Sequence, residues 1–92
     1  MIERKVADAA AAETVVRRAL ENQYGTKLKG MSFRKCWYSA AGTQEFWDVE
    51  GALIWKRGLF SSEAKNFRYQ VDTTTGRIIG YELTTPISSK NK

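Results

Sequence analysis

The chain has 92 residues, which is enough for one domain with a single core, and 42% of them are apolar while 27% are charged. Fifteen Lys and Arg against ten Asp and Glu give a net charge of +5, with an isoelectric point near 9.6. The chain has no histidine, so the commonest general base and the commonest metal ligand are excluded, and no run of about 18 apolar residues predicts a membrane span.

Residues 6–24 are predicted to form the only helix, because apolar side chains recur at spacings of three and four along one stripe. The stripe contains Ala9, Ala12, Val16, Ala19, Leu20 and Tyr24. Gly25 follows directly, and we expect it to end the helix with a left-handed conformation.

Four strands are predicted after the helix, at 31–40, 45–57, 65–73 and 77–84. The faces of the first strand are uncertain because Lys35 interrupts the alternation, and a β-bulge would resolve the conflict. The simple alternation places Met31, Phe33 and Trp37 on one side, with Arg34, Cys36 and Tyr38 on the other.

The remaining strands alternate more clearly. Gly51 falls on the apolar side of the second strand, where it would permit bending or a close approach of the helix. The apolar side of the last two strands contains Phe67, Tyr69, Val71, Ile79, Tyr81 and Leu83. Ile54 of the second strand and Ile78 of the fourth fall on the outer side, where they are expected to form a small apolar patch for a dimer or partner. Pro86 is expected to end the fourth strand because it cannot donate a ladder hydrogen bond.

A helix followed by four one-sided strands predicts an α+β domain, with the N-terminal helix packed on a four-stranded antiparallel meander sheet. Residues 1–87 are assigned to this single domain, and 88–92 to a disordered C-terminal tail. A half-barrel that encloses a ligand pocket, and a homodimer through a sheet edge or through the far face, remain as alternatives to a simple monomer.

Cysteine usage favours a reducing compartment, because Cys36 is the only cysteine and small secreted domains usually contain several. The N-terminal residues lack the apolar segment of a signal peptide. We therefore expect a cytoplasmic protein that does not bind membranes.

Catalysis is not expected from this sequence. Asp48 and Glu50 share one face of the second strand at roughly 6.5–7 Å, a separation that suits paired-carboxylate chemistry. Cross-strand pairing with a cation such as Arg34, Lys56 or Arg68 explains the same two carboxylates more simply. No metal-ligand spacing and no phosphate-binding glycine loop occur, so neither a cofactor nor an enzymatic activity is predicted.

Two binding functions remain. The favoured one is a protein or peptide partner at the loop after the second strand, where Lys56, Arg57, Leu59 and Phe60 combine apolar with basic side chains. For Leu59 and Phe60, the sequence slightly favours an arrangement in which they fold back to cap the core. The alternative function is single-stranded nucleic-acid binding by a basic, aromatic-bearing outer sheet face, with Arg34, Tyr38, Lys56 and Arg68 as contacts.

The last hairpin has the pattern Phe-x-Tyr-x-Val-Asp-x-x-Thr-Gly-x-Ile, formed by Phe67, Tyr69, Val71, Asp72, Thr75, Gly76 and Ile78 or Ile79. With the preceding helix, this pattern resembles the PepSY-type domain, and the architecture is similar to the cystatin-like group. The resemblance implies inhibition or chaperoning of a protein partner. It implies no inhibitory residues, because residues 39–44 do not match the glutamine-valine-glycine loop of cystatins.

Overall fold

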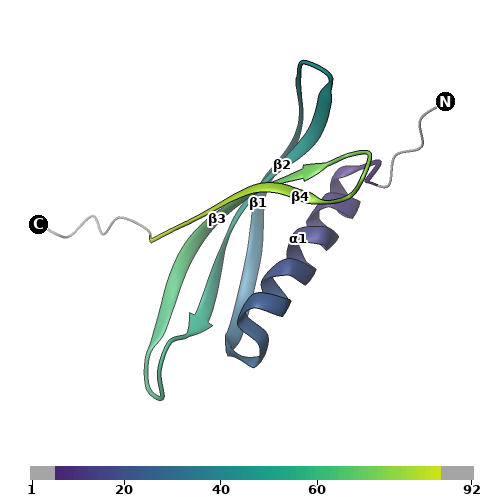
Figure 1. Ribbon diagram of the computed structural model, residues 1–92. Helices are drawn as coiled ribbons and strands as arrows, with labels where there is room; N and C mark the ends of the chain where they lie inside the picture. Colours follow the sequence, from purple (N-terminus) through teal and green to yellow (C-terminus); the bar gives the residue numbers. More distant parts are fainter. Residues whose placement is uncertain (1–5, 86–92) are drawn as a thin grey trace, which may run out of the picture.

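The computed structural model describes residues 6–85, so the predicted tail at 88–92 and the expected strand end at Pro86 lie outside the described residues. The elements are α1 (Ala9–Tyr24), the 3-10 turn η1 (Gly25–Lys27), β1 (Leu28–Ala41), β2 (Gln44–Lys56), β3 (Ser62–Asp72) and β4 (Ile78–Thr84). The strands form one antiparallel sheet in the order β1-β2-β3-β4, and α1 packs on one face of it (Figure 1). The predicted α+β class and meander topology are confirmed.

The helix begins at Ala9, three residues later than the sequence predicts. Asp8 is its N-cap, and the Asp8 carboxylate accepts a hydrogen bond of 2.8 Å from the Ala11 amide. Val6 is tied to the sheet instead, because its amide donates to the Thr73 carbonyl and its carbonyl accepts from the Trp47 indole. At the other end, Gly25 stops the helix with a φ of 61°, as expected.

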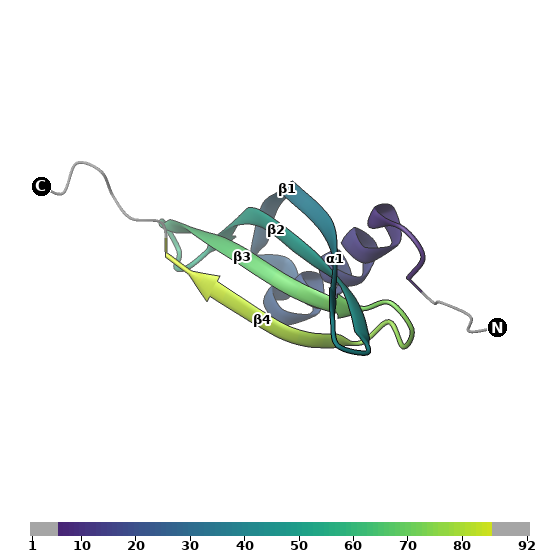
Figure 2. The same cartoon turned by 90° about the horizontal axis from the view of Figure 1, so that it is seen from above.

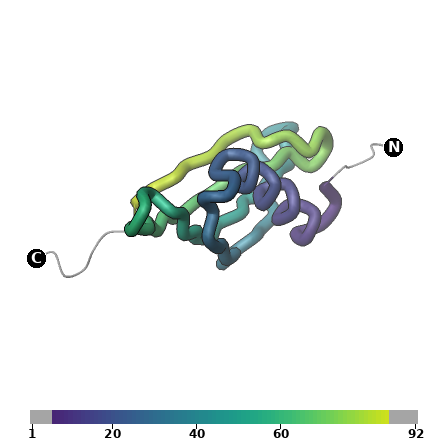
Figure 3. Tube along the Cα trace, turned by 90° about the horizontal axis from the view of Figure 1, so that it is seen from below, coloured from purple at the N-terminus to yellow at the C-terminus, as the bar shows by residue number. Residues whose placement is uncertain are grey.

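The core lies between α1 and the inner face of the sheet, which is the face turned toward the helix (Figure 3). The helix contributes three fully buried side chains at the predicted spacing, namely Ala12, Val16 and Leu20. The sheet contributes Val49, Leu53, Phe67, Tyr69 and Val71. The opposite, outer face of the sheet is not covered by any other described element, and β1 and β4 lie at its edges (Figure 2).

Gly51 allows the closest approach in the sheet. A Cβ atom at this position would collide with the Ser32 carbonyl oxygen of β1 and lie 2.6 Å from Cζ of Phe67. The expected close approach is therefore present, but it involves the neighbouring strand and an aromatic ring instead of the helix.

Asp72 and Gly76, two residues of the hairpin pattern, build the β3–β4 turn. The Asp72 carboxylate accepts hydrogen bonds from the amides of Thr74 and Thr75, at 2.8 and 2.9 Å, and Gly76 has a φ of 75°. The Thr75 amide, with help from Gln44, lowers the pKa of Asp72 below its ordinary value. Residues 67–83 are therefore the predicted hairpin.

A β-bulge in β1 corrects the predicted faces of that strand. The register between β1 and β2 shifts between Phe33 and Lys35, which exchanges the sides of all later residues. Cys36 consequently packs against the core, where its thiol lies 3.8 Å from the Ala9 carbonyl oxygen, and Tyr38 contacts the inner residue Trp47. Trp37, predicted to be apolar core, lies on the outer face instead.

A second shift, between Gln70 and Val71, corrects the start of β4. Ile78 pairs with Val71 and packs against the core, although the sequence predicts it on the outer face. Ile79 is the extra residue of this bulge and is 42% exposed. The predicted outer patch of Ile54 with Ile78 therefore retains only Ile54, which is half-exposed.

Candidate functional site

The connection between β2 and β3 is a tight loop that projects from one end of the sheet (Figure 1). We call residues 57–61 the β2–β3 tip. Its base is closed by two backbone hydrogen bonds, because the amides of Arg57 and Gly58 both donate to the Ser61 carbonyl, at 3.0 and 3.3 Å. Because these hydrogen bonds join residues only three or four positions apart, the loop is short, and the side chains of Leu59 and Phe60 point away from the sheet into solvent.

Leu59 and Phe60 are the most exposed large apolar residues of the described chain, at 75% and 94%. The expectation that they fold back to cap the core is therefore wrong. The Arg57–Ser61 closure turns the loop before these side chains could reach the helix or the inner face of the sheet. The structure instead leaves them in the position that a contact site requires.

Three cationic side chains lie on one side of the tip, beside Leu59. A shallow depression of about 400 Å³ beside Leu59 is lined by Thr26, Lys27, Lys56, Arg57, Gly58 and Leu59. Glu63 is the nearby carboxylate, and it lies 3.9 Å from the exposed guanidinium of Arg57. All four residues predicted for partner binding, including Lys56, thus lie together at one end of the sheet, joined by Lys27 from η1.

The outer face beside the tip continues the apolar surface. Ile54 and Ala64 are directly paired across β2 and β3, and both are exposed. They border a shallow hollow of about 330 Å³ lined by Gly30, Met31, Ser32, Ala52, Leu53, Ile54 and Ala64. A partner that covers the tip would therefore meet further apolar surface along the sheet.

Farther along the outer face, Asp48 is a buried carboxylate, 2% exposed, within a polar network. It accepts hydrogen bonds from Ser39 at 2.9 Å, from Gln70 at 3.2 Å and from the Arg68 guanidinium at 3.3 Å. Arg68 also lies 3.9 Å from Glu50, and its guanidinium is 5.6 Å from the Trp37 ring centroid. The neighbouring side chains of this network thus shield the Asp48 carboxylate from water, although no helix covers the outer face.

The network shows what Asp48 and Glu50 do in the fold. Both carboxylates pair with Arg68 across the β2–β3 ladder, so the cross-strand interpretation of the two acids is confirmed. The four hydrogen-bond contacts of Asp48 occupy both of its oxygens. The sequence missed Trp37 and Ser39 as members, because the β1 bulge decides which side chains of that strand reach the outer face. Gln70 of β3 is not singled out either, because alternation alone does not show which polar residue of a strand will bond to Asp48.

The four residues predicted for nucleic-acid binding do not form one surface. Tyr38 lies on the inner side with its ring 5.8 Å from that of Trp47, whereas Arg68 is on the outer face. Arg34 donates a hydrogen bond of 3.0 Å to Asn66, and Lys56 lies at the far end beside the tip. A single strand that follows the outer face would therefore meet Arg34 and an already paired Arg68, but not the stacking ring of Tyr38.

The Cys36 thiol is expected to react slowly, because it is half-buried and packs against the core. Burial raises its pKa from 9.0 to about 11, with smaller contributions from the charges of Glu13 and Asp48. The thiolate is the reactive form, so at pH 8 we expect alkylation by iodoacetamide to be about 100-fold slower than for an ordinary cysteine. The rate should rise with pH until about pH 11, and unfolding in urea should restore ordinary reactivity. Equal rates for the folded and unfolded chain would contradict the burial of Cys36.

Residues 6–85 include no group of three or more His, Cys, Asp or Glu side chains placed to hold a metal ion. Within the same part of the chain, no helix has both the length and the apolar character to cross a bilayer.

Comparison of the chain with protein-family models, with curated proteins and with solved structures gave no match.

Proposed function

We propose that this protein is a non-enzymatic binding module that docks a protein or peptide segment at the β2–β3 tip. The exposure of Leu59 and Phe60 on a closed, outward-projecting loop is the observation that carries the proposal. Transfer of a large apolar side chain out of water contributes about 1.5–3 kcal/mol. Burial of both side chains under a partner would therefore contribute several kcal/mol to the free energy of binding.

The charges around the tip indicate the chemistry of the partner. Lys27, Lys56 and Arg57 line the same depression as Leu59, and the carboxylate of Glu63 lies close to Arg57. A segment that places Asp or Glu beside a large apolar residue would match both features. We therefore expect an acidic segment with an aromatic or branched aliphatic anchor.

The likeness of the 67–83 hairpin to PepSY-type domains supports the same class of function. Protein partners are what that resemblance implies, through inhibition or chaperoning, and the helix-on-sheet architecture is similar to that of cystatin-like proteins. We place this module in the cytoplasm, because a single half-buried cysteine is typical of proteins kept in a reducing compartment.

Selection from random peptides tests the proposal and shows which kind of segment binds. Phage-displayed peptides are selected on the immobilised protein and counter-selected on the Leu59→Ser/Phe60→Ser variant. We expect enriched peptides that combine Asp or Glu with a large apolar residue. Their affinity should fall by about tenfold or more in the double variant, since each 1.4 kcal/mol corresponds to a factor of ten. Amide shifts on titration should map to residues 26–27 and 56–60.

Tyr81→Ser is the matched control, because it removes an exposed aromatic side chain from another part of the sheet and should leave the affinity unchanged. Peptides that bind the double variant as well as the original protein would contradict the proposal. So would binding to anionic phospholipid vesicles that is lost in the same double variant, because the tip would then contact lipid instead of a protein.

A further inference from the structure

The two edges of the sheet differ in how well they are protected against pairing. β1 has two register irregularities and three charged residues, Lys29, Arg34 and Lys35. Bulges and lysines are the usual devices that prevent edge pairing. β4 has one bulge at its beginning and a single charged residue, Glu82, in the sequence Ile-Ile-Gly-Tyr-Glu-Leu-Thr. The free edge of β4 is therefore less protected than that of β1 against pairing with another strand.

The helix covers only part of the inner face of β4, because Ile78 and Leu83 pack against the core while Tyr81 stays exposed. Helix α1 packs against β1, β2 and β3, and β4 extends past it at the edge of the sheet (Figures 2 and 3). Tyr81 consequently remains 66% exposed although it stacks on buried Tyr69, with ring centroids 5.5 Å apart. An apolar strip therefore runs along a free strand edge, with exposed Tyr81 at its centre, exposed Ile79 on one side and half-buried Leu83 on the other.

We propose that β4 pairs with β4 of a second copy of this chain, in an antiparallel two-fold arrangement centred on Tyr81. The sequence of the strand is self-complementary in this register. Tyr81 faces Tyr81 of the second copy, and Ile79 faces Leu83, so the apolar strip of each copy covers that of the other. Glu82 faces Gly80, so the two carboxylates are not directly opposite one another.

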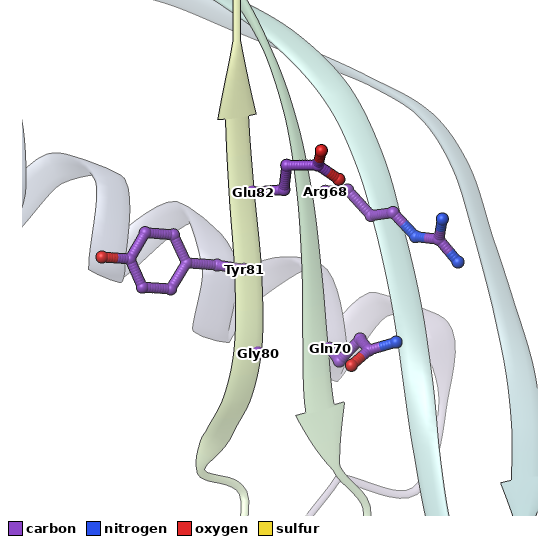
Figure 4. A pocket seen from close by; sticks show the side chains of 5 residues that line it. All are labelled: Arg68, Gln70, Gly80, Tyr81 and Glu82. Atoms are coloured by element: carbon purple, nitrogen blue, oxygen red, sulfur yellow. The ribbon is translucent and has the colours of Figure 1, made fainter.

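The outer face at Gly80 provides room for the facing glutamate. Gly80 lies opposite Gln70, and a hollow of about 240 Å³ is lined there by Arg68, Gln70, Gly80, Tyr81 and Glu82. Figure 4 shows Tyr81 pointing to one side of β4, while the side chains of Glu82, Arg68 and Gln70 point to the other. The second copy's glutamate would extend over Gly80 at the rim of this hollow, where its carboxylate stays in contact with water.

The pairing of a strand of seven residues buries less than a standard interface of about 1,600 Å², so we expect a weak dimer. Its dissociation constant should lie between about 10 µM and about 1 mM, in the range of transient contacts. The β2–β3 tip takes no part in this pairing, so the dimer is independent of the proposed peptide binding.

Sedimentation velocity over that concentration range tests the pairing. We expect a reversible monomer–dimer equilibrium for the original chain and a monomer for Tyr81→Lys, because two ammonium groups would then face each other. Phe60→Ser removes an exposed aromatic residue elsewhere and should leave the equilibrium unchanged. A chain that stays monomeric throughout, or a dimer that survives Tyr81→Lys, would overturn the proposal.

A crosslink identifies the register. Opposite Cα atoms of an antiparallel pair are about 4.5–5.5 Å apart, within the range for a disulfide. In a Cys36→Ser background, Tyr81→Cys should therefore give a covalent dimer under mild oxidation. Ile54→Cys, half-exposed on the outer face, should not. Equal crosslinking at both positions would contradict the β4 pairing.

Discussion

Gly51→Ala is expected to destabilise the protein by about 3 kcal/mol or more. The added Cβ would meet the Ser32 carbonyl oxygen, a backbone atom that cannot move without shifting β1, and would press on the Phe67 ring at 2.6 Å. For a domain of this size the unfolding temperature should fall by about 12 °C or more, as measured by circular dichroism.

Gly30→Ala is the matched control for this substitution. It also lies in the β1–β2 ladder, opposite Ile54, but a Cβ atom there meets nothing within 4 Å. We expect a change within about 0.5 kcal/mol, or a slight stabilisation, since alanine loses less backbone entropy than glycine. If both variants lost stability equally, the close approach at Gly51 would not be the cause.

Asp48→Ala is expected to cost about 2 kcal/mol of folding free energy. The substitution removes the common acceptor of Ser39, Gln70 and Arg68 from a site that water does not reach. Hydrogen bonds to a buried charged group contribute about 1.5–3 kcal/mol. The Arg68 side chain is 46% exposed and can recover water, so the ion pair itself contributes only a part of this loss.

Two further variants separate the causes of that loss. Asp48→Asn keeps the shape of the side chain and one acceptor oxygen, so we expect about half of the destabilisation. Glu82→Ala removes an exposed carboxylate on the same face, and chemical denaturation should show a change within about 0.5 kcal/mol. An Asp48→Ala variant as stable as the original chain would contradict the importance of the network.

The elements with uninterrupted alternation are predictable from the sequence. In β3, and in β4 from Gly80 onward, the residues alternate with period two on either side of a turn in which Asp72 and Gly76 have evident backbone roles. β1 cannot be assigned in the same way. A bulge adds one residue and reverses every later side chain, and its position depends on cross-strand packing instead of on the local pattern.

The sequence predicts which residues form the candidate site, but it does not predict whether Leu59 and Phe60 are exposed or buried. Lys56, Arg57, Leu59 and Phe60 are adjacent in sequence, so any fold that exposes one of them tends to expose the others. The apolar members favour burial, because transfer from water is favourable for them. What decides the outcome is the hydrogen bonding of the loop backbone to Ser61, which leaves no length of chain for a return to the core.

The proposed function requires that Leu59 and Phe60 are free for a partner and not needed by the fold. The free energy of unfolding of the Leu59→Ser/Phe60→Ser variant tests this most directly, by urea denaturation beside the original protein. The structure predicts a difference within about 0.5 kcal/mol, as for exposed positions. A loss of about 2 kcal/mol or more would mean that these side chains pack into the folded protein, and would contradict the assignment of the β2–β3 tip as a binding surface.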